Sequence, residues 1–230
     1  QKFEKEKHAI KKNRFSPLEL FDDDSIQKVR QISYNSTSEV YEVNCNEHYV
    51  QKIFHCKSKV EKHLKVFVQE CESIIGLNCP NVVKIYGIQT TKFPPSILTE
   101  LCASNLKKKV KSLSHEDRVK VILGICNGMK EIHKARIIHG GLKLENILLD
   151  EDNNAKVSDF GILTFMDKEI DPKTMVFMAP ELMLEKSDYD EKIDIYAFGV
   201  VLYAILNDGA YPKISENDVC RGKKAPIPQN

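Results

Sequence analysis

The chain has 230 residues, of which 42% are hydrophobic, so it can bury a sizeable core in one or two domains. Its formal net charge of +1 argues against general binding to nucleic acids or to acidic membranes. The longest apolar stretch, residues 193–206, is shorter than a membrane span and carries Asp194 near its start. We therefore expect a buried helix there and no membrane segment in this chain.

The seven cysteines are scattered along the chain and include no Cys-x-x-Cys pair. An odd and scattered set is typical of reduced thiols, which predicts a cytoplasmic protein. The chain starts at Gln1 and shows no signal peptide. We expect it to be a piece of a longer protein whose targeting signals can lie elsewhere.

Residues 1–24 differ in composition from the rest of the chain. A run rich in lysine and glutamate is followed by three consecutive aspartates at 22–24. Charge runs of this kind are usually solvated. We interpret the segment as a charged lead-in helix or linker rather than as a docking motif.

Short β-prone runs follow at residues 28–32, 40–43, 49–54, 82–87 and 96–99. Polar turn residues separate the first three runs, which predicts three antiparallel strands. The last two runs complete a predicted sheet of five strands.

Two segments show helical periodicity. Residues 57–77 carry apolar side chains at three- and four-residue steps among charged ones, which predicts one helix. A second helix is predicted after Ser114, because Ser114 and Asp117 form a capping pair ahead of a periodic apolar run.

The most informative feature is a series of short motifs in the second half of the chain. His-Gly-Gly-Leu-Lys at 139–143 precedes Asn146, and Asp-Phe-Gly follows at 159–161. Ala-Pro-Glu occupies 179–181, and Asp194 opens the apolar helix. This series resembles the catalytic loop, the magnesium loop, the end of the activation segment and the F helix of eukaryotic protein kinases.

Further matches keep the same order along residues 25–228. Residues 78–87 resemble the joint between the C helix and strand four, and residues 98–106 resemble the tyrosine-kinase-like group. The resemblance implies an α+β, bilobal protein-kinase-like fold. Residues 25–99 would form a small lobe with a five-stranded antiparallel sheet and one helix, and residues 100–230 a large, mainly helical lobe.

The resemblance also implies that the last helices of the large lobe are missing, because the family normally continues beyond the position of Asn230. Glu181 would then lack its usual buried arginine partner. An isolated fragment would be less stable for that reason.

In this family, a strand-three lysine and two oxygen ligands hold ATP and magnesium. Lys52 falls at the lysine position and would bind the α- and β-phosphates, with Glu70 as its ion-pair partner. Asp159 and Asn146 would ligate Mg²⁺, which prefers oxygen ligands. The alternative for Lys52 and Glu70 is a pair of unrelated surface charges, which the surrounding register disfavours.

The resemblance also implies an adenine pocket. Leu148 would form its floor, Val40 and Val50 its roof, and Thr99 its gate. The main chain from Glu100 to Cys102 would form the hinge.

The glycine-rich loop of the family is degraded in this chain. Its three glycine positions carry Ser33, Asn35 and Ser38. Glycine lets the backbone approach phosphate closely, so we expect these replacements to weaken nucleotide binding without abolishing it.

The catalytic loop shows two losses. Gly140 stands where the family has the arginine that contacts a phosphorylated activation loop, and Gly141 stands where it has the catalytic-base aspartate. Lys143 is retained in the form typical of serine/threonine kinases. Glu145 is the only other carboxylate close in sequence, and its position in the family points away from the substrate.

Three functions remain open. The favoured one is an ATP- and magnesium-binding, catalytically impaired kinase domain that acts as a switch or docking module for protein partners. The second is an active serine/threonine kinase that acts on protein substrates with a compensated catalytic loop. The third is an interaction scaffold without nucleotide, which the degraded glycine loop favours and the retained polar residues disfavour.

Overall fold

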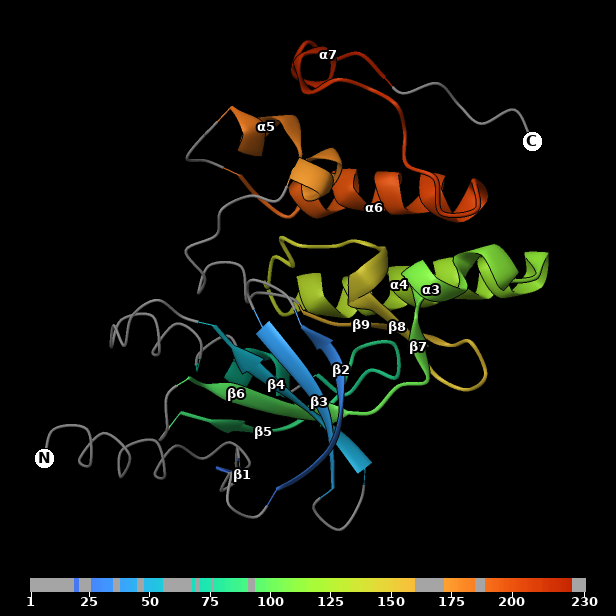
Figure 1. Cartoon of the computed structure of the whole chain (residues 1–230). Helices are drawn as coiled ribbons and strands as arrows, with labels where there is room; N and C mark the ends of the chain where they lie inside the picture. The colour runs from blue at the N-terminus through green and yellow to red at the C-terminus, as the bar shows by residue number, and fades with distance from the viewer. Residues whose placement is uncertain are drawn as a thin grey trace, which may run out of the picture.

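The computed structural model describes residues 19–20, 26–34, 38–44, 48–55, 68, 71–75, 77–90, 94–159, 172–184 and 189–224. These residues form a sheet lobe and a mainly helical lobe, with the short β-hairpin of the helical lobe lying between them (Figure 1). The arrangement confirms the predicted α+β, two-lobed fold class.

The sheet of the small lobe contains six described strands in the order β1-β5-β6-β4-β3-β2. Their bounds are β1 (Glu19–Leu20), β2 (Gln27–Tyr34), β3 (Ser38–Asn44), β4 (His48–Phe54), β5 (Ile85–Gln89) and β6 (Ser96–Glu100). The pairs among β2 to β6 are antiparallel, as predicted. β6 lies between two neighbours and is buried along most of its length, whereas the edge strand β2 is exposed throughout.

The extra strand β1 corrects the interpretation of the charged lead-in. It lies within residues 1–24 and pairs in parallel with Gly87 and Ile88 of β5. The backbone groups at the edge of a sheet are unpaired, and a short added strand satisfies them. This part of the lead-in is therefore a strand of the sheet and not a linker.

The fourth predicted strand is shifted along the chain. Residues 82–87 were expected, but β5 begins at Ile85, and Val82 instead forms a parallel bridge with Val157. Val83 N donates to Val157 O at 2.9 Å, and Val157 N donates to Asn81 O at 2.8 Å. Pairing with the other lobe thus takes the first residues of the run away from the sheet.

Only part of the predicted helix at 57–77 can be described. Residues 71–75 are helical, with Cys71 and Ile74 buried. Glu70, the predicted partner of Lys52, lies outside the described residues.

The described elements of the large lobe are short apart from two long helices. In chain order they are β7 (Ser104–Asn105), α3 (Leu106–Lys109), the 3-10 turn η2 (Val110–Ser112), α4 (His115–Lys134), the 3-10 turn η3 (Leu144–Asn146), β8 (Ile147–Leu149), β9 (Ala155–Val157), the 3-10 turn η5 (Pro172–Phe177), α5 (Pro180–Met183), α6 (Lys192–Leu206) and α7 (Glu216–Cys220).

The helix α4 begins at the predicted cap. Ser114 Oγ accepts a hydrogen bond from Asp117 N at 3.0 Å, which satisfies one of the free N–H groups of the first turn. Further along, a Cβ added to Gly128 would lie 2.4 Å from Asn81 O. Only a glycine allows the helix to pack this closely on the segment that connects to the sheet lobe.

The helix α6 is the apolar run predicted to be buried. Its side chains join those of α4, β8 and β9 in one core. Among the described helices, none is long and apolar enough to cross a membrane.

Candidate functional site

Lys52 and Asp159 meet between the two lobes. Lys52 lies in the middle of β4, paired with Val40 and Ile97, and Asp159 follows β9. Lys52 Nζ lies 2.7 Å from Asp159 Oδ1. The structure thus brings together two of the residues that the sequence assigned to one site.

The surroundings of Asp159 favour its ionised form. Burial raises the pKa of its carboxyl group, but the charge and hydrogen bond of Lys52, together with the charges of His139 and Lys143, lower it by more. The net pKa therefore lies below the ordinary value for aspartate. A charged oxygen ligand beside two lysines is suited to a site where a metal ion and phosphate groups meet.

The loop at 139–143 is held by the buried carboxylate of Asp194. Asp194 is 1% exposed, and its two oxygens accept the main-chain N–H groups of His139 and Gly140, each at 2.8 Å. His133 Nε2 lies 2.9 Å from the same carboxylate. Asp194, at the start of the apolar helix, thus anchors this loop through its main chain.

Gly141 is also held through its main chain. Its N–H donates to His139 Nδ1 at 3.1 Å, and its carbonyl accepts from Asn146 Nδ2 at 2.8 Å. Gly140 has a φ of 67°, whereas Gly141 is not among the residues with positive φ. A left-handed backbone therefore does not explain why residue 141 is a glycine.

Asn146 connects this loop to the residue before Asp159. Its carbonyl accepts hydrogen bonds from Ser158 N at 2.9 Å and from Ser158 Oγ at 3.0 Å. The amide nitrogen of Asn146 donates to Gly141, so its amide oxygen is the side-chain atom that remains to ligate a metal. No cluster of three or more acidic, histidine or cysteine side chains suited to a metal occurs in the described ranges. Mg²⁺ commonly uses one or two protein oxygens together with phosphates, so Asp159 and Asn146 fit it.

The residues assigned to the adenine pocket come from both lobes. Val40 and Val50 lie on β3 and β4, and Val50 is paired with Thr99 on β6. Thr99 is buried, and Leu148 is half-buried on β8 of the large lobe. Their assignment to nucleotide binding stays a prediction.

Cys102 belongs to the segment that joins the two lobes. It is half-buried, and burial is the main cause that raises its pKa to about 12, with the charge of Glu100 adding to the effect. The thiol is therefore neutral at physiological pH and a poor nucleophile.

The predicted glycine-loop residues lie in or next to a β-hairpin. Ser33 is exposed in β2, where it pairs with Val40, and Ser38 is the buried first residue of β3. Asn35 lies outside the described residues. The strands β2 and β3 therefore include two of the positions that the sequence assigned to a loop.

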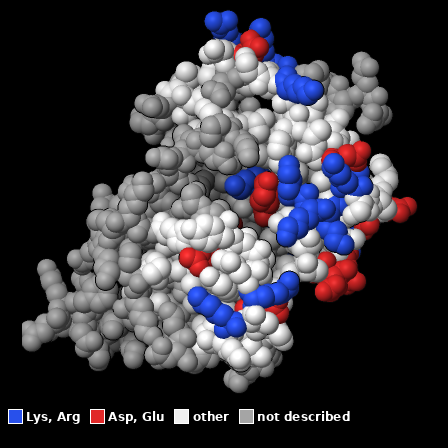
Figure 2. Space-filling view, in the orientation of Figure 1, with Lys and Arg blue, Asp and Glu red and all other residues white. Residues whose placement is uncertain are grey.

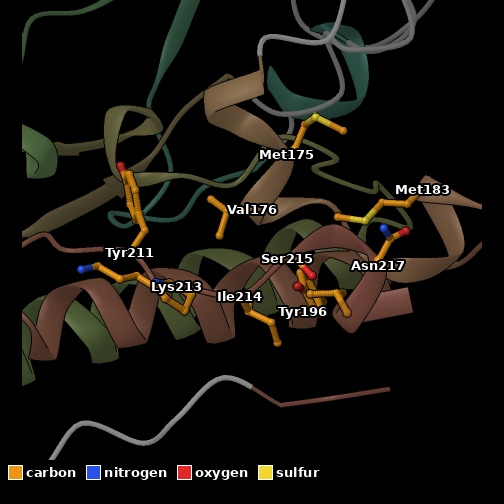
Figure 3. Close-up of a pocket in the computed structure, with 11 residues that line it drawn as sticks. Met175, Val176, Met183, Tyr196, Tyr211, Lys213, Ile214, Ser215 and Asn217 are labelled. Carbon is orange, nitrogen blue, oxygen red and sulfur yellow. The ribbon is translucent and has the colours of Figure 1, made fainter. Parts of the chain in front are cut away.

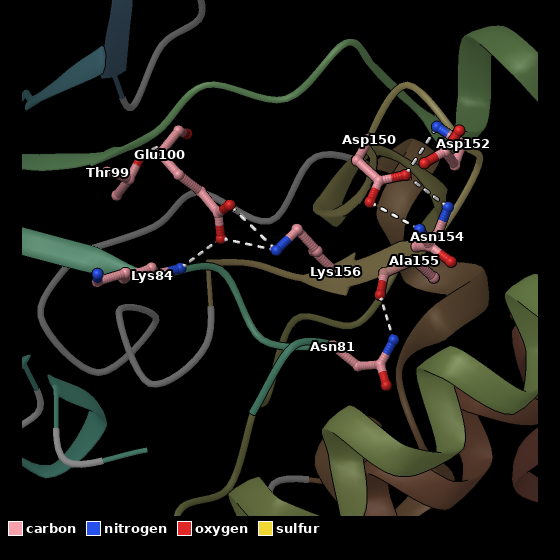
Figure 4. A network of polar contacts seen from close by, with 9 residues as sticks. All are labelled: Asn81, Lys84, Thr99, Glu100, Asp150, Asp152, Asn154, Ala155 and Lys156. Atoms are coloured by element: carbon pink, nitrogen blue, oxygen red, sulfur yellow. Dashed lines mark hydrogen bonds and ion pairs between the residues drawn. The ribbon is translucent and has the colours of Figure 1, made fainter. Parts of the chain in front are cut away.

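The sequence missed an ion pair that ties the lobes together. Glu100 Oε2 lies 3.0 Å from Lys156 Nζ on β9, and Glu100 Oε1 accepts from Lys84 N at 2.8 Å (Figure 4). Beside it, Asn81 Nδ2 donates to Ala155 O at 2.8 Å. Glu100 was assigned through its backbone alone, but its side chain links the end of β6 to the β8–β9 hairpin.

A family model for the protein kinase domain matches residues 26–224. The chain belongs to the protein kinase family. The chain is 32% identical over 212 residues to the dual specificity protein kinase shkE of Dictyostelium discoideum, covering 83% of this chain and 30% of that protein. The chain is 30% identical to the dual specificity protein kinase shkD of the same organism over an alignment of 239 residues, covering 94% of this chain and 31% of that protein.

A third relative is a probable LRR receptor-like serine/threonine-protein kinase of Arabidopsis thaliana. It is 34% identical over 175 residues, which is 70% of this chain and 17% of that protein. The kinase domain thus matches less than a third of the length of each of these three relatives.

A second contact that the sequence missed concerns His133. It lies in the last turn of α4 and contacts Asp194 of α6, although 61 positions separate the two residues. A histidine near a helix end is common, so nothing local in the sequence singles it out.

Proposed function

We propose that this kinase domain binds ATP with magnesium, transfers phosphate poorly, and acts mainly as a switch or docking module for protein partners. The observation that carries the proposal is the contrast within one site. Lys52, Asp159 and Asn146 keep the charges and oxygens that ATP and Mg²⁺ require, while the loop beside them has no side chain at Gly141. A positioned general base contributes about 10²–10⁴-fold to a rate.

Bound ATP would supply the γ-phosphoryl group, and magnesium would supply positive charge that holds the phosphates. Lys52 would hold phosphate oxygens, and Asp159 and Asn146 would hold the metal. Serine and asparagine in place of glycine at the β2–β3 connection favour weak binding, because the backbone approaches phosphate less closely.

A second candidate is a serine/threonine kinase with a compensated loop. The charge of Lys143 contributes to the lowered pKa of Asp159, which supports a role for this lysine near the proposed metal site. Phosphoryl transfer depends mostly on positioning and charge stabilisation, so this lysine and the metal would supply much of the rate.

A thermal-shift titration tests nucleotide binding. A ligand that binds only the native state raises its melting temperature as the ligand concentration exceeds Kd. We expect a rise with millimolar ATP and Mg²⁺, a smaller rise with ATP alone, and little rise with magnesium tripolyphosphate as the control for phosphate alone. No response to ATP under either condition would instead support the scaffold without nucleotide.

A further inference from the structure

A pocket of about 510 Å³ lies in the large lobe, between η5, α5, α6 and the chain that leads into α7 (Figure 3). None of the residues assigned to ATP or Mg²⁺ lines it. The pocket is therefore separate from the candidate nucleotide site. A group of side chains in the small lobe lies much closer to that site, at the base of the predicted glycine loop.

The strands β2, β3 and β4 come together beside the predicted glycine loop. Tyr34 ends β2 and is the cross-strand partner of Glu39 in β3. Ser38 begins β3 and is the partner of Phe54, which ends β4. The end of β2 and the start of β3 lie toward the large lobe (Figure 1). Pairs at the end of a ladder open more readily than pairs in its middle, so side-chain contacts here decide how firmly the strands stay closed.

His55 follows β4 and contacts both strands of the β2–β3 hairpin. Its Nε2 lies 3.0 Å from Glu39 Oε1, and its ring centroid lies 5.5 Å from that of Tyr34. The side chains of His55 and Glu39 are 28% and 29% exposed. A partly buried contact of this kind is screened less by salt than an exposed one. One imidazole ring thus joins residues on both sides of positions 35–37.

Glu39 is also held from its other side. Tyr41 Oη donates to Glu39 Oε2 at 2.5 Å, and Gln31 Nε2 donates to Tyr41 Oη at 3.3 Å. The hydrogen bond from Tyr41 is the main cause that lowers the pKa of Glu39, and the hydrogen bond from His55 lowers it further. Glu39 is therefore an ionised acceptor whose two oxygens are both directed by neighbouring side chains.

The strand that His55 follows also carries the lysine assigned to phosphate. Lys52 lies in β4, and its partner in β3 is Val40, the residue after Glu39. The contact between His55 and Glu39 therefore fixes the start of β3 relative to Lys52. Lys52 in turn pairs with Asp159 at 2.7 Å. A binding segment whose ends are already in place loses less conformational entropy when the ligand binds.

We propose that His55 is a positioning residue for the phosphates of ATP, because it holds Tyr34 and Glu39 together beside Lys52. The proposal rests on the ATP binding proposed above. The three replaced glycine positions keep the backbone farther from phosphate, so the affinity depends more on where the two ends of the loop are held. His55 acts on the phosphates and not on the adenine, which the adenine-pocket residues would hold.

Isothermal titration calorimetry with Mg-ATP and with adenosine tests this role, using His55→Ala and a matched control, His48→Ala. His48 begins β4 at its other end, and its Nδ1 lies 2.9 Å from Glu42 Oε1. Glu42 also pairs with Arg30 at 2.6 Å. Charged side chains of both signs gather on the small lobe at the side away from the large lobe (Figure 2). The control thus removes a histidine–glutamate contact from the same two strands, far from the predicted loop.

We expect His55→Ala to weaken Mg-ATP binding by about threefold to tenfold and adenosine binding little, and His48→Ala to change neither. Glu39→Ala should cause a similar loss. The double variant Glu39→Ala/His55→Ala should lose no more than the larger single loss, because both changes break one contact. Melting temperatures confirm that each variant is folded. Equal losses for ATP and adenosine, equal effects of the two histidine changes, or additive losses in the double variant would overturn the proposal.

Hydrogen exchange without nucleotide separates this role from ATP binding itself. Amides in the segment that contains Tyr34 and Glu39 should exchange faster in His55→Ala than in the wild type, because the strand ends open more often, and should be unchanged in His48→Ala. A wild type that shows this difference but binds no ATP would refute nucleotide binding and the positioning role with it, and keep the contact as part of the fold. A wild type that binds ATP, with no faster exchange in His55→Ala, would refute the positioning role alone.

Discussion

Charged side chains hold one half of the candidate site, and main-chain hydrogen bonds hold the other. Lys52 and Asp159 form an ion pair at 2.7 Å across the lobes. Gly140 and Gly141 are fixed instead through their backbone groups, by Asp194 and Asn146. A loop fixed in this way keeps its shape when its side chains are deleted. Catalytic side chains can thus be lost on one side of the site while the fold and the ion pair on the other side remain.

The largest expected effect comes from the anchor of the main-chain half. Asp194→Ala leaves the N–H groups of His139 and Gly140 without their acceptor and should cost about 3–5 kcal/mol in the free energy of unfolding. Urea denaturation measures the cost. Asp208→Asn is the matched control, because Asp208 pairs with Arg118 but is 67% exposed, surface ion pairs contribute about 0–1 kcal/mol, and asparagine tolerates the φ of 49° at this position. Similar losses in both variants would refute the special role of Asp194.

The next effect concerns the charged half. Lys52→Met should weaken ATP binding with or without Mg²⁺, and Asp159→Asn should weaken mainly the magnesium-dependent part, each by about tenfold or more. Asparagine is the right replacement because Asp159 has a φ of 61°, a conformation that asparagine tolerates. Isothermal titration calorimetry measures both affinities. Equal losses that do not depend on magnesium would indicate general destabilisation.

A smaller effect separates the two adjacent glycines. Gly140→Ala places a side chain at a φ of 67° and should cost about 1–2 kcal/mol of stability. Gly141→Ala should be neutral or slightly stabilising, because Gly141 is not left-handed and alanine reduces the entropy of the unfolded chain. Urea denaturation of the two variants checks the difference. A larger cost at Gly141 would show that its backbone excludes a side chain.

Several elements of the fold could be predicted because residues close together in the sequence determine them. The Ser114 cap, the apolar helix α6 and the antiparallel strands β2 to β6 follow from neighbouring residues, and Asp194 was recognised through its motif. Motif spacing also brought Lys52 and Asp159 together correctly.

Contacts between distant residues were not predictable in the same way. The Glu100–Lys156 hydrogen bond joins residues 56 positions apart, and no periodicity marks either of them. Val82 has the same strand propensity as its neighbours in β5, so only the competing partner Val157 explains its shift. β1 contains two residues, which is too short for any pattern.

The most direct test compares phosphate transfer by the wild type and by Gly141→Asp, with ATP affinity and melting temperature measured on both. Aspartate would place an acceptor beside Asn146 and Lys143, so turnover on a generic protein substrate should rise by about 10²-fold or more. ATP affinity should change little. The contradicting result is a wild type that already turns over at an ordinary kinase rate, that loses this rate in Asp159→Asn, and that gains nothing from Gly141→Asp.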